Sequence, residues 1–254
     1  MNIYTRFSLA KLIAICLATL TFFSLAEDIN DGTDPTKLAN TAFGQYKHTD
    51  LGVLGNVGLF EFSYGMPIDQ NQRMNVTAKL PVASGVINND FSIGDVSLTF
   101  THIASLNQKR GLAYSTELIF DTADRAELGL GNSVLKLSAF YVKFLESGGI
   151  FAPAIVQQNN ISNSTNRASV NNTTIDLYYV PKLKNPGYFI TFDPSITADW
   201  ENDKNFLSLS VTFGRILGKA FGGNSQIFVK PQILGGSERP ADWSLQIGYK
   251  VIGF

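Results

Sequence analysis

The sequence predicts an all-β transmembrane antiparallel up-and-down β-barrel of about 12 strands. Three observations predict it: an N-terminal export signal, polar and apolar residues that alternate with a period of two, and a final phenylalanine. Such barrels carry an even number of strands, so about 10 or 14 would also fit. We assign residues 1–26 to a signal peptide, 27–52 to a periplasmic segment with a possible first strand, and 53–254 to the barrel.

The first 26 residues have the layout of a secretory signal peptide. Arg6 and Lys11 are positive, 12–23 is apolar, and small residues precede a cleavage point after Ala26. A retained anchor helix is the alternative, but the apolar run is shorter than the roughly 20 residues that a spanning helix needs. Cys16 lies within this segment after the bulky Ile15, which argues against lipidation and leaves the mature chain without cysteine.

Period-two alternation marks the strands. In 73–80, one face carries Met74, Val76, Ala78 and Leu80, and the other carries Arg73, Asn75, Thr77 and Lys79. Residues 206–215 and 243–251 alternate in the same way. Weaker candidates cover about 53–65, 91–103, 110–121, 132–146, 149–157, 172–182, 187–200 and 224–235, and a twelfth strand is expected near 38–50.

The connections predict an orientation. With both termini in the periplasm, the extracellular connections would be about 83–90, 122–131, 158–172, 201–205 and 236–241. The periplasmic ones would include 147–148, 183–186 and a longer one near 216–221. The polar stretch 158–172 then falls outside and the tightest turn inside, as in outer-membrane barrels.

The closing Phe254 is typical of the last strand of bacterial outer-membrane barrels, and we expect it to contact the barrel-assembly machinery. It is one residue out of phase with the apolar row of 243–251. A local bulge at Gly253 would restore the phase.

No catalytic, metal or cofactor site is predicted. With 20 basic and 21 acidic residues, the chain lacks the basic surface of a nucleic-acid binder. His48 and His102 are the only histidines, too few for an evident zinc site. Ser105 lies three residues from His102, on the opposite face of a strand. A hydrolase using either histidine is the least favoured function.

Charged residues on the polar faces are the candidate functional residues, because lipid disfavours them. The lumen-lining candidates are Arg73, Lys79, Asp95, Glu117, Asp176, Lys230 and Lys250. They either fill the lumen or line an aqueous path. We favour a channel or transporter for small molecules. A plugged structural or adhesive barrel is the main alternative, and a soluble periplasmic β-sandwich with Trp200 and Trp243 in its core is another.

Short motifs resemble the outer-membrane transporters of the phenol-degradation MetA-pathway family. They are 93–98 (IGDVSL), 78–81 (AKLP) and the 129–131 (GLG) turn that follows Asp121. The resemblance spans roughly 55–254. It implies a barrel distantly like the long-chain fatty-acid transporters that passes small hydrophobic or aromatic solutes. It supplies no catalytic residues. As an outer-membrane barrel, the protein is expected to be surrounded by lipid and lipopolysaccharide.

Overall fold

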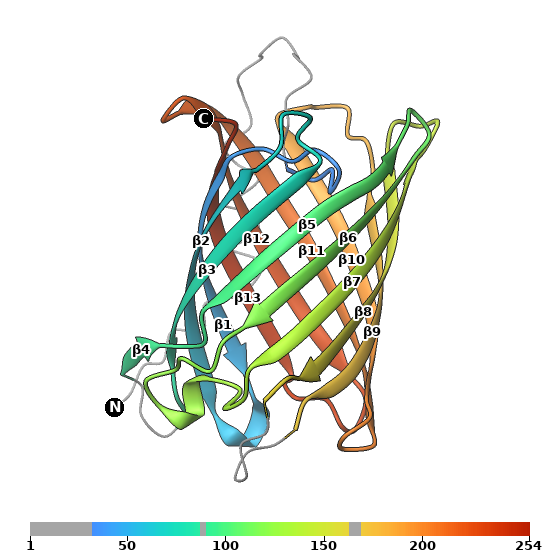
Figure 1. Ribbon diagram of the computed structural model, residues 1–254. Helices are drawn as coiled ribbons and strands as arrows, with labels where there is room; N and C mark the ends of the chain where they lie inside the picture. The colour runs from blue at the N-terminus through green and yellow to red at the C-terminus, as the bar shows by residue number, and fades with distance from the viewer. Residues whose placement is uncertain (1–31, 87–89, 163–168) are drawn as a thin grey trace, which may run out of the picture.

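The computed structural model describes residues 32–86, 90–162 and 169–254. The predicted signal peptide lies outside these ranges. Within them, 13 strands form a single antiparallel sheet that closes on itself, since β13 pairs with β1 and β2 pairs with β3 (Figure 1). The short β4 pairs only along β3, so the barrel wall has 12 strands. The predicted fold class is confirmed.

The strand bounds follow the predicted segments closely. The strands are β1 Thr41–Asp50, β2 Asn56–Pro67, β3 Met74–Ser84, β4 Phe91–Ile93, β5 Ser97–Leu106, β6 Arg110–Ile119, β7 Val134–Phe144, β8 Ile150–Asn160, β9 Asn171–Val180, β10 Tyr188–Asp199, β11 Lys204–Ala220, β12 Gly223–Gly235 and β13 Trp243–Ile252. Two single-turn 3-10 helices, η1 Gly52–Leu54 and η2 Ala126–Leu128, lie in the connections. Across the described ranges, every helix is too short or too polar to span a bilayer.

Connection lengths differ between the two ends of the barrel. At the terminal end, where β1 begins and β13 ends, the connections are 68–73, 107–109, 145–149, 181–187 and 221–222. At the opposite loop end they are 51–55, 85–96, 120–133, 161–170, 200–203 and 236–242. The longer connection predicted near 216–221 is wrong, because β11 continues to Ala220 past a register shift between Ile216 and Gly218.

The outer face of the wall is apolar. In β3, Met74 and Leu80 are exposed, while Asn75 between them is buried. Large apolar side chains on the neighbouring strands continue the exposed row, including Tyr64 on β2 and Leu98 on β5. A closed barrel with an apolar outer band satisfies its backbone groups internally and presents hydrocarbon to lipid.

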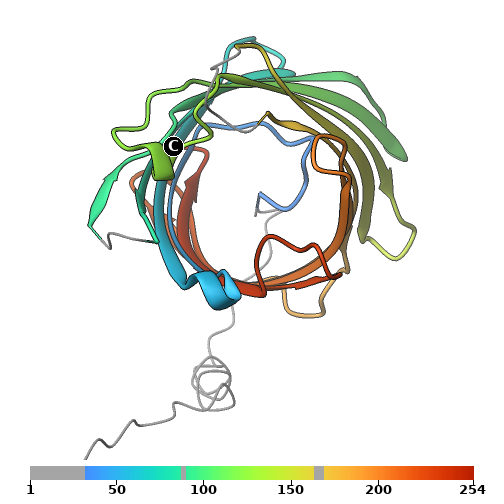
Figure 2. The ribbon, with the colours of Figure 1, turned by 90° about the horizontal axis from the view of Figure 1, so that it is seen from below.

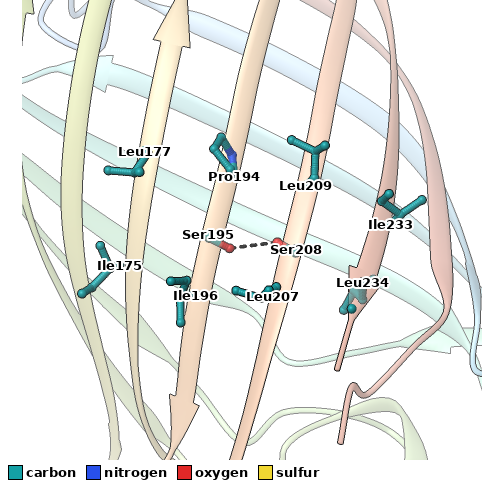
Figure 3. A pocket seen from close by; sticks show the side chains of 11 residues that line it. Ile175, Leu177, Pro194, Ser195, Ile196, Leu207, Ser208, Leu209, Ile233 and Leu234 are labelled. Carbon is teal, nitrogen blue, oxygen red and sulfur yellow. Dashed lines mark hydrogen bonds between the residues drawn. The ribbon is translucent and has the colours of Figure 1, made fainter. Parts of the chain in front are cut away.

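A shallow apolar groove lies on this outer face over β9 to β12 (Figure 3). Pro194 lines the groove and pairs with Leu209 of β11. On the β9 side, the ladder has no pair between Phe192↔Tyr179 and Ser195↔Asp176, because proline has no N–H to donate. The groove is therefore part of the lipid-facing surface.

The final residues turn outward. Gly253 has φ +75°, in the left-handed region that glycine tolerates, and β13 ends at Ile252. Phe254 consequently lies with its ring centroid 6.2 Å from that of the outward-facing Tyr64. The structure therefore supports the predicted irregularity at Gly253, which puts Phe254 in phase with the outer row.

The predicted strand 91–103 is broken in two. β4 pairs with the end of β3 and lies outside the barrel wall, and residues 94–96 connect it to β5 (Figure 1). Asp95 holds this break, because its carboxylate accepts the N–H groups of Thr122, Ala123 and Leu130. The three N–H groups belong to the 120–133 connection. They bind the Asp95 carboxylate there, although strand alternation had placed Asp95 on the barrel wall.

Candidate functional site: the inner wall of the barrel

The inner wall is polar because alternation sends the remaining side chains away from lipid. Its charged groups join across strands rather than along them. Lys79 of β3 reaches past β5 to Glu117 of β6, with Nζ 2.7 Å from Oε1. Lys136 of β7 approaches the other oxygen of Glu117 at 3.3 Å, and the Ser97 hydroxyl donates to Oε1 at 2.8 Å. Glu117 is thus shared by two lysines.

A second cluster lies on β9, β10 and β12. Lys230 Nζ is 2.7 Å from Asp193 Oδ2, and the Ser210 hydroxyl donates to the same oxygen at 3.2 Å. Asp176 of β9 interacts electrostatically with Asp193 and Lys230. Asp176 and Asp193 also share a side-chain hydrogen bond, so two carboxyl groups and one ammonium meet here.

Lys47 and Glu61 connect the two clusters around the wall. Lys47 on β1 interacts with Lys230 on one side and Glu61 of β2 on the other. Glu61 accepts a hydrogen bond from Gln45 at 3.1 Å. It lies opposite Pro81, two residues from Lys79 on the same face of β3. Lys47 and Glu61 therefore lie between the cluster on β9, β10 and β12 and the cluster on β3, β6 and β7.

We call this set the charge belt. It comprises Lys47, Glu61, Lys79, Glu117, Lys136, Asp176, Asp193 and Lys230, that is, four lysines and four carboxylic acids. A hydrogen bond between the Asp176 and Asp193 carboxyl groups requires a proton on one of them. The belt therefore presents fields of both signs to a passing solute.

Hydroxyl side chains occupy the wall beside the belt. Ser195 and Ser208 lie 2.8 Å apart across β10 and β11, as Figure 3 shows. The hydroxyls of Thr174 and Thr197 lie 2.9 Å apart across β9 and β10. These groups satisfy each other in the resting wall, and each can exchange its partner for water or for a solute hydroxyl.

Toward the terminal end, the inner wall carries an aromatic patch of Phe43, Phe189 and Phe228. Phe43 and Phe228 stack with ring centroids 5.8 Å apart, and Lys250 Nζ lies 5.6 Å from the Phe43 ring centroid. Glycines make room for the rings between these strands. A Cβ on Gly214 would overlap Phe189, and one on Gly248 would overlap Phe228. The sequence places small residues opposite large ones so that the rings lie flat along the wall.

The structure brings together some of the predicted lumen residues and separates others. Lys79, Glu117, Asp176 and Lys230 belong to the charge belt, and Lys250 lies over the aromatic patch. Arg73 and Asp95 do not lie on the wall. Arg73 is exposed in the connection before β3, and Asp95 anchors the connection before β5.

Sequence reasoning missed four members of the belt: Lys47, Glu61, Lys136 and Asp193. Each lies in a segment predicted to be a strand or near one, and extending the alternation would have placed Lys136 and Asp193 inward. What the sequence does not reveal is which charged side chains pair with one another. Asp193 lies 37 residues from Lys230 in the sequence, and no local pattern relates them.

Both histidines lie on the outward rows. His48 packs against Trp243 with ring centroids 5.4 Å apart, and His102 pairs with the exposed Tyr114 and Met74. Neither is placed to act as a base for a lumen serine. In the described ranges, no group of three or more His, Cys, Asp or Glu is arranged to hold a metal ion.

Comparison with known proteins places the fold. No family model and no curated protein matches the chain, so the family resemblance is not confirmed. Among solved structures, the COG4313 outer membrane channel from Pseudomonas putida F1 is similar at 15% identity and TM-score 0.63, covering 89% of this chain and 100% of its own. The KdgM porin (8% identity, TM-score 0.59, covering 83% and 98%) and the NanC porin (10%, 0.59, 84% and 99%) are also similar. The chain has the barrel fold of outer-membrane channels and porins.

Proposed function

We propose that this protein is a channel of the bacterial outer membrane that lets small solutes cross. The charge belt carries this proposal. It lines the inside of a closed barrel whose outside is apolar, and a barrel filled only for stability could pack its interior with apolar side chains at lower cost. The barrel fold shared with outer-membrane channels and porins supports the same location and role. Lipid, lipopolysaccharide and, through the last strand and Phe254, the barrel-assembly machinery are its expected partners.

The solutes we propose are small and amphipathic, with an aromatic or other apolar part and a polar group. The aromatic patch offers flat ring faces on which an aromatic solute can stack. The charge belt and its hydroxyl neighbours offer both donors and acceptors to the polar end. This agrees with the hydrophobic or aromatic solutes that the sequence resemblance implies.

Single-channel conductance of the purified mature protein in a planar bilayer tests the channel. Current steps with weak preference between cations and anions are expected, because the belt carries charged groups of both signs. Uptake into proteoliposomes then tests the solute class. A phenol carboxylate should enter faster than a neutral sugar of similar size, and it alone should block the ion current.

A matched pair of variants separates the patch from general damage. Phe228→Ala removes a ring from the inner wall, whereas Phe213→Ala removes an exposed ring from the outer face. Loss of block by the aromatic solute in the first variant alone supports the proposal. If the aromatic solute blocks both variants equally, the aromatic patch does not bind the solute.

The plugged structural barrel remains a second candidate, because residues 32–40 lie inside the ring of strands in Figure 2. It predicts silent bilayers for the intact protein and for every variant.

A further inference from the structure

We propose that residues 32–40, here called the lumen segment, form a built-in plug that closes the terminal end of the barrel and must move for solutes to pass. This inference rests on the proposed channel function. Figure 2 looks along the barrel and shows this blue segment inside the ring of strands. The first ladder pair of β1 is Thr41↔Ile252, so the lumen segment ends where the wall begins.

One contact ties the lumen segment to β9. The Tyr178 hydroxyl donates to the carbonyl oxygen of Thr33 at 3.0 Å, and Thr33 is only 7% exposed. Tyr178 belongs to the inner row of β9, two residues from Asp176 of the charge belt. The segment therefore crosses from β1 to a strand well around the barrel.

A second set of contacts joins the segment to β12 and β13. Gly32 lies so close to the wall that a Cβ there would stand 2.6 Å from Ile252 Cδ1 and 3.4 Å from both the Gln226 amide nitrogen and Lys250 Nζ. Lys250 also lies over the aromatic patch. The segment thus occupies the space in front of the patch.

A third contact reaches β6. Thr36 is 5% exposed, and its Cγ2 would stand 3.0 Å from a Cβ on Gly111. A turn shapes the segment here, because Asp34 Oδ1 accepts both the N–H and the hydroxyl of Thr36. The turn packs against Gly111 of β6.

These contacts span the lumen. They lie on β6, β9, β12 and β13, which are spread around the barrel in the sheet order. A segment that touches all four at one end blocks the passage between the patch and that end. Residues 32–40 precede the first strand, which begins at Thr41, so the segment can detach without breaking the ladders of the wall.

A reversible crosslink between Thr36→Cys and Gly111→Cys tests the plug. The two positions are close enough for a disulfide, whose Cβ atoms stand about 3.5–4.5 Å apart. The predicted mature chain has no other cysteine, so the single-cysteine variants are matched controls. We expect the oxidised double variant to lose its current steps and to recover them with a reductant. The current steps of both single-cysteine controls should be the same in oxidant and in reductant. A second variant without residues 27–39 should stay open several-fold longer in each opening than the intact protein.

Each outcome decides the proposal. Failure of the two thiols to join would overturn the placement of the segment. Equal current in the oxidised and reduced double variant would overturn the plug but leave the channel standing. Absence of current even without residues 27–39 would overturn both, since removal of a plug must reveal a pore. Tyr178→Phe should lengthen the openings of the otherwise intact chain, because it removes the hydroxyl that donates to Thr33.

Discussion

Lys230 Nζ lies 2.7 Å from Asp193 Oδ2, although β11 separates their two strands. Strands of such barrels tilt by about 35–45°, which brings side chains of second-neighbour strands to the same level. Lys79 and Glu117 meet across β5 by the same geometry. The charge belt is therefore a consequence of barrel closure.

We expect Lys230→Met to lower the free energy of unfolding by about 1–3 kcal/mol, because it leaves Asp193 and Asp176 without their shared ammonium. The side chains of Lys230 and Asp193 are only 27% and 19% exposed, so water compensates little. Urea unfolding in detergent measures the loss. A double variant with Asp193→Asn should cost less than the sum of the single changes, and strict additivity would show that the pair is not coupled.

Lys79→Gln should shift ion selectivity toward cations, because it removes one of the two lysines that share Glu117. The measurement is the reversal potential in a salt gradient. Arg73→Gln is the matched control, since Arg73 lies exposed in a connection at the terminal end. A larger shift with Arg73→Gln would move the selectivity-setting region from the belt to the rim.

Val76→Arg should cost about 2–4 kcal/mol of folding free energy, because it places charge on the lipid-facing row of β3. Val76 pairs with Phe100 and Met66, both exposed on the outer face. Thr77→Arg, on the inner row, should cost less. Refolding yield into lipid vesicles with urea titration compares the two. The reverse order would invert the assignment of faces.

Asp124 holds β4 in place through contacts with Ser92 and Ile93, and these contacts should weaken in acid. Hydrogen bonds from the Ser92 hydroxyl and the Ile93 N–H hold the pKa of Asp124 below its usual value. A lowered carboxyl pKa stabilises the folded contact above the unfolded pKa, and this contribution is lost as pH falls through the folded pKa. The protection factor of the Ile93 amide, its exchange rate relative to an unstructured peptide at the same pH, should therefore fall below about pH 4, near the ordinary Asp pKa. In Asp124→Asn, this protection factor should be low at neutral pH as well. A protection factor in Asp124→Asn that still falls below pH 4 would point to another group.

Epitopes at the two ends should report the orientation. A tag inserted after Glu238, in the 236–242 connection at the loop end, should bind antibody on intact cells. A tag after Asn185, in the 181–187 connection at the terminal end, should bind only after permeabilisation. The opposite result would place the terminal end outside the cell.

Several features could be read from the sequence because they are local. The pleat of a strand sends alternate residues to opposite faces, and lipid tolerates charge on only one of them. The alternation of 73–80 thus predicted that Lys79 points away from lipid, and the strand segments from 38–50 to 243–251 gave a barrel of 12 strands. The phase change at Gly253 was also visible, because Phe254 breaks the alternation.

The tertiary structure decided what local patterns cannot encode. Which inner side chains meet depends on the tilt and register of the whole closed sheet, so the pairing of Lys230 with Asp193 and the sharing of Glu117 by two lysines had no sequence signal. Asp95 alternates like a wall residue, but the 120–133 connection folds back to offer it three N–H groups and removes it from the wall. The lumen segment shows no periodicity at all. Its place inside the barrel is fixed by contacts with strands that closure alone brings around it.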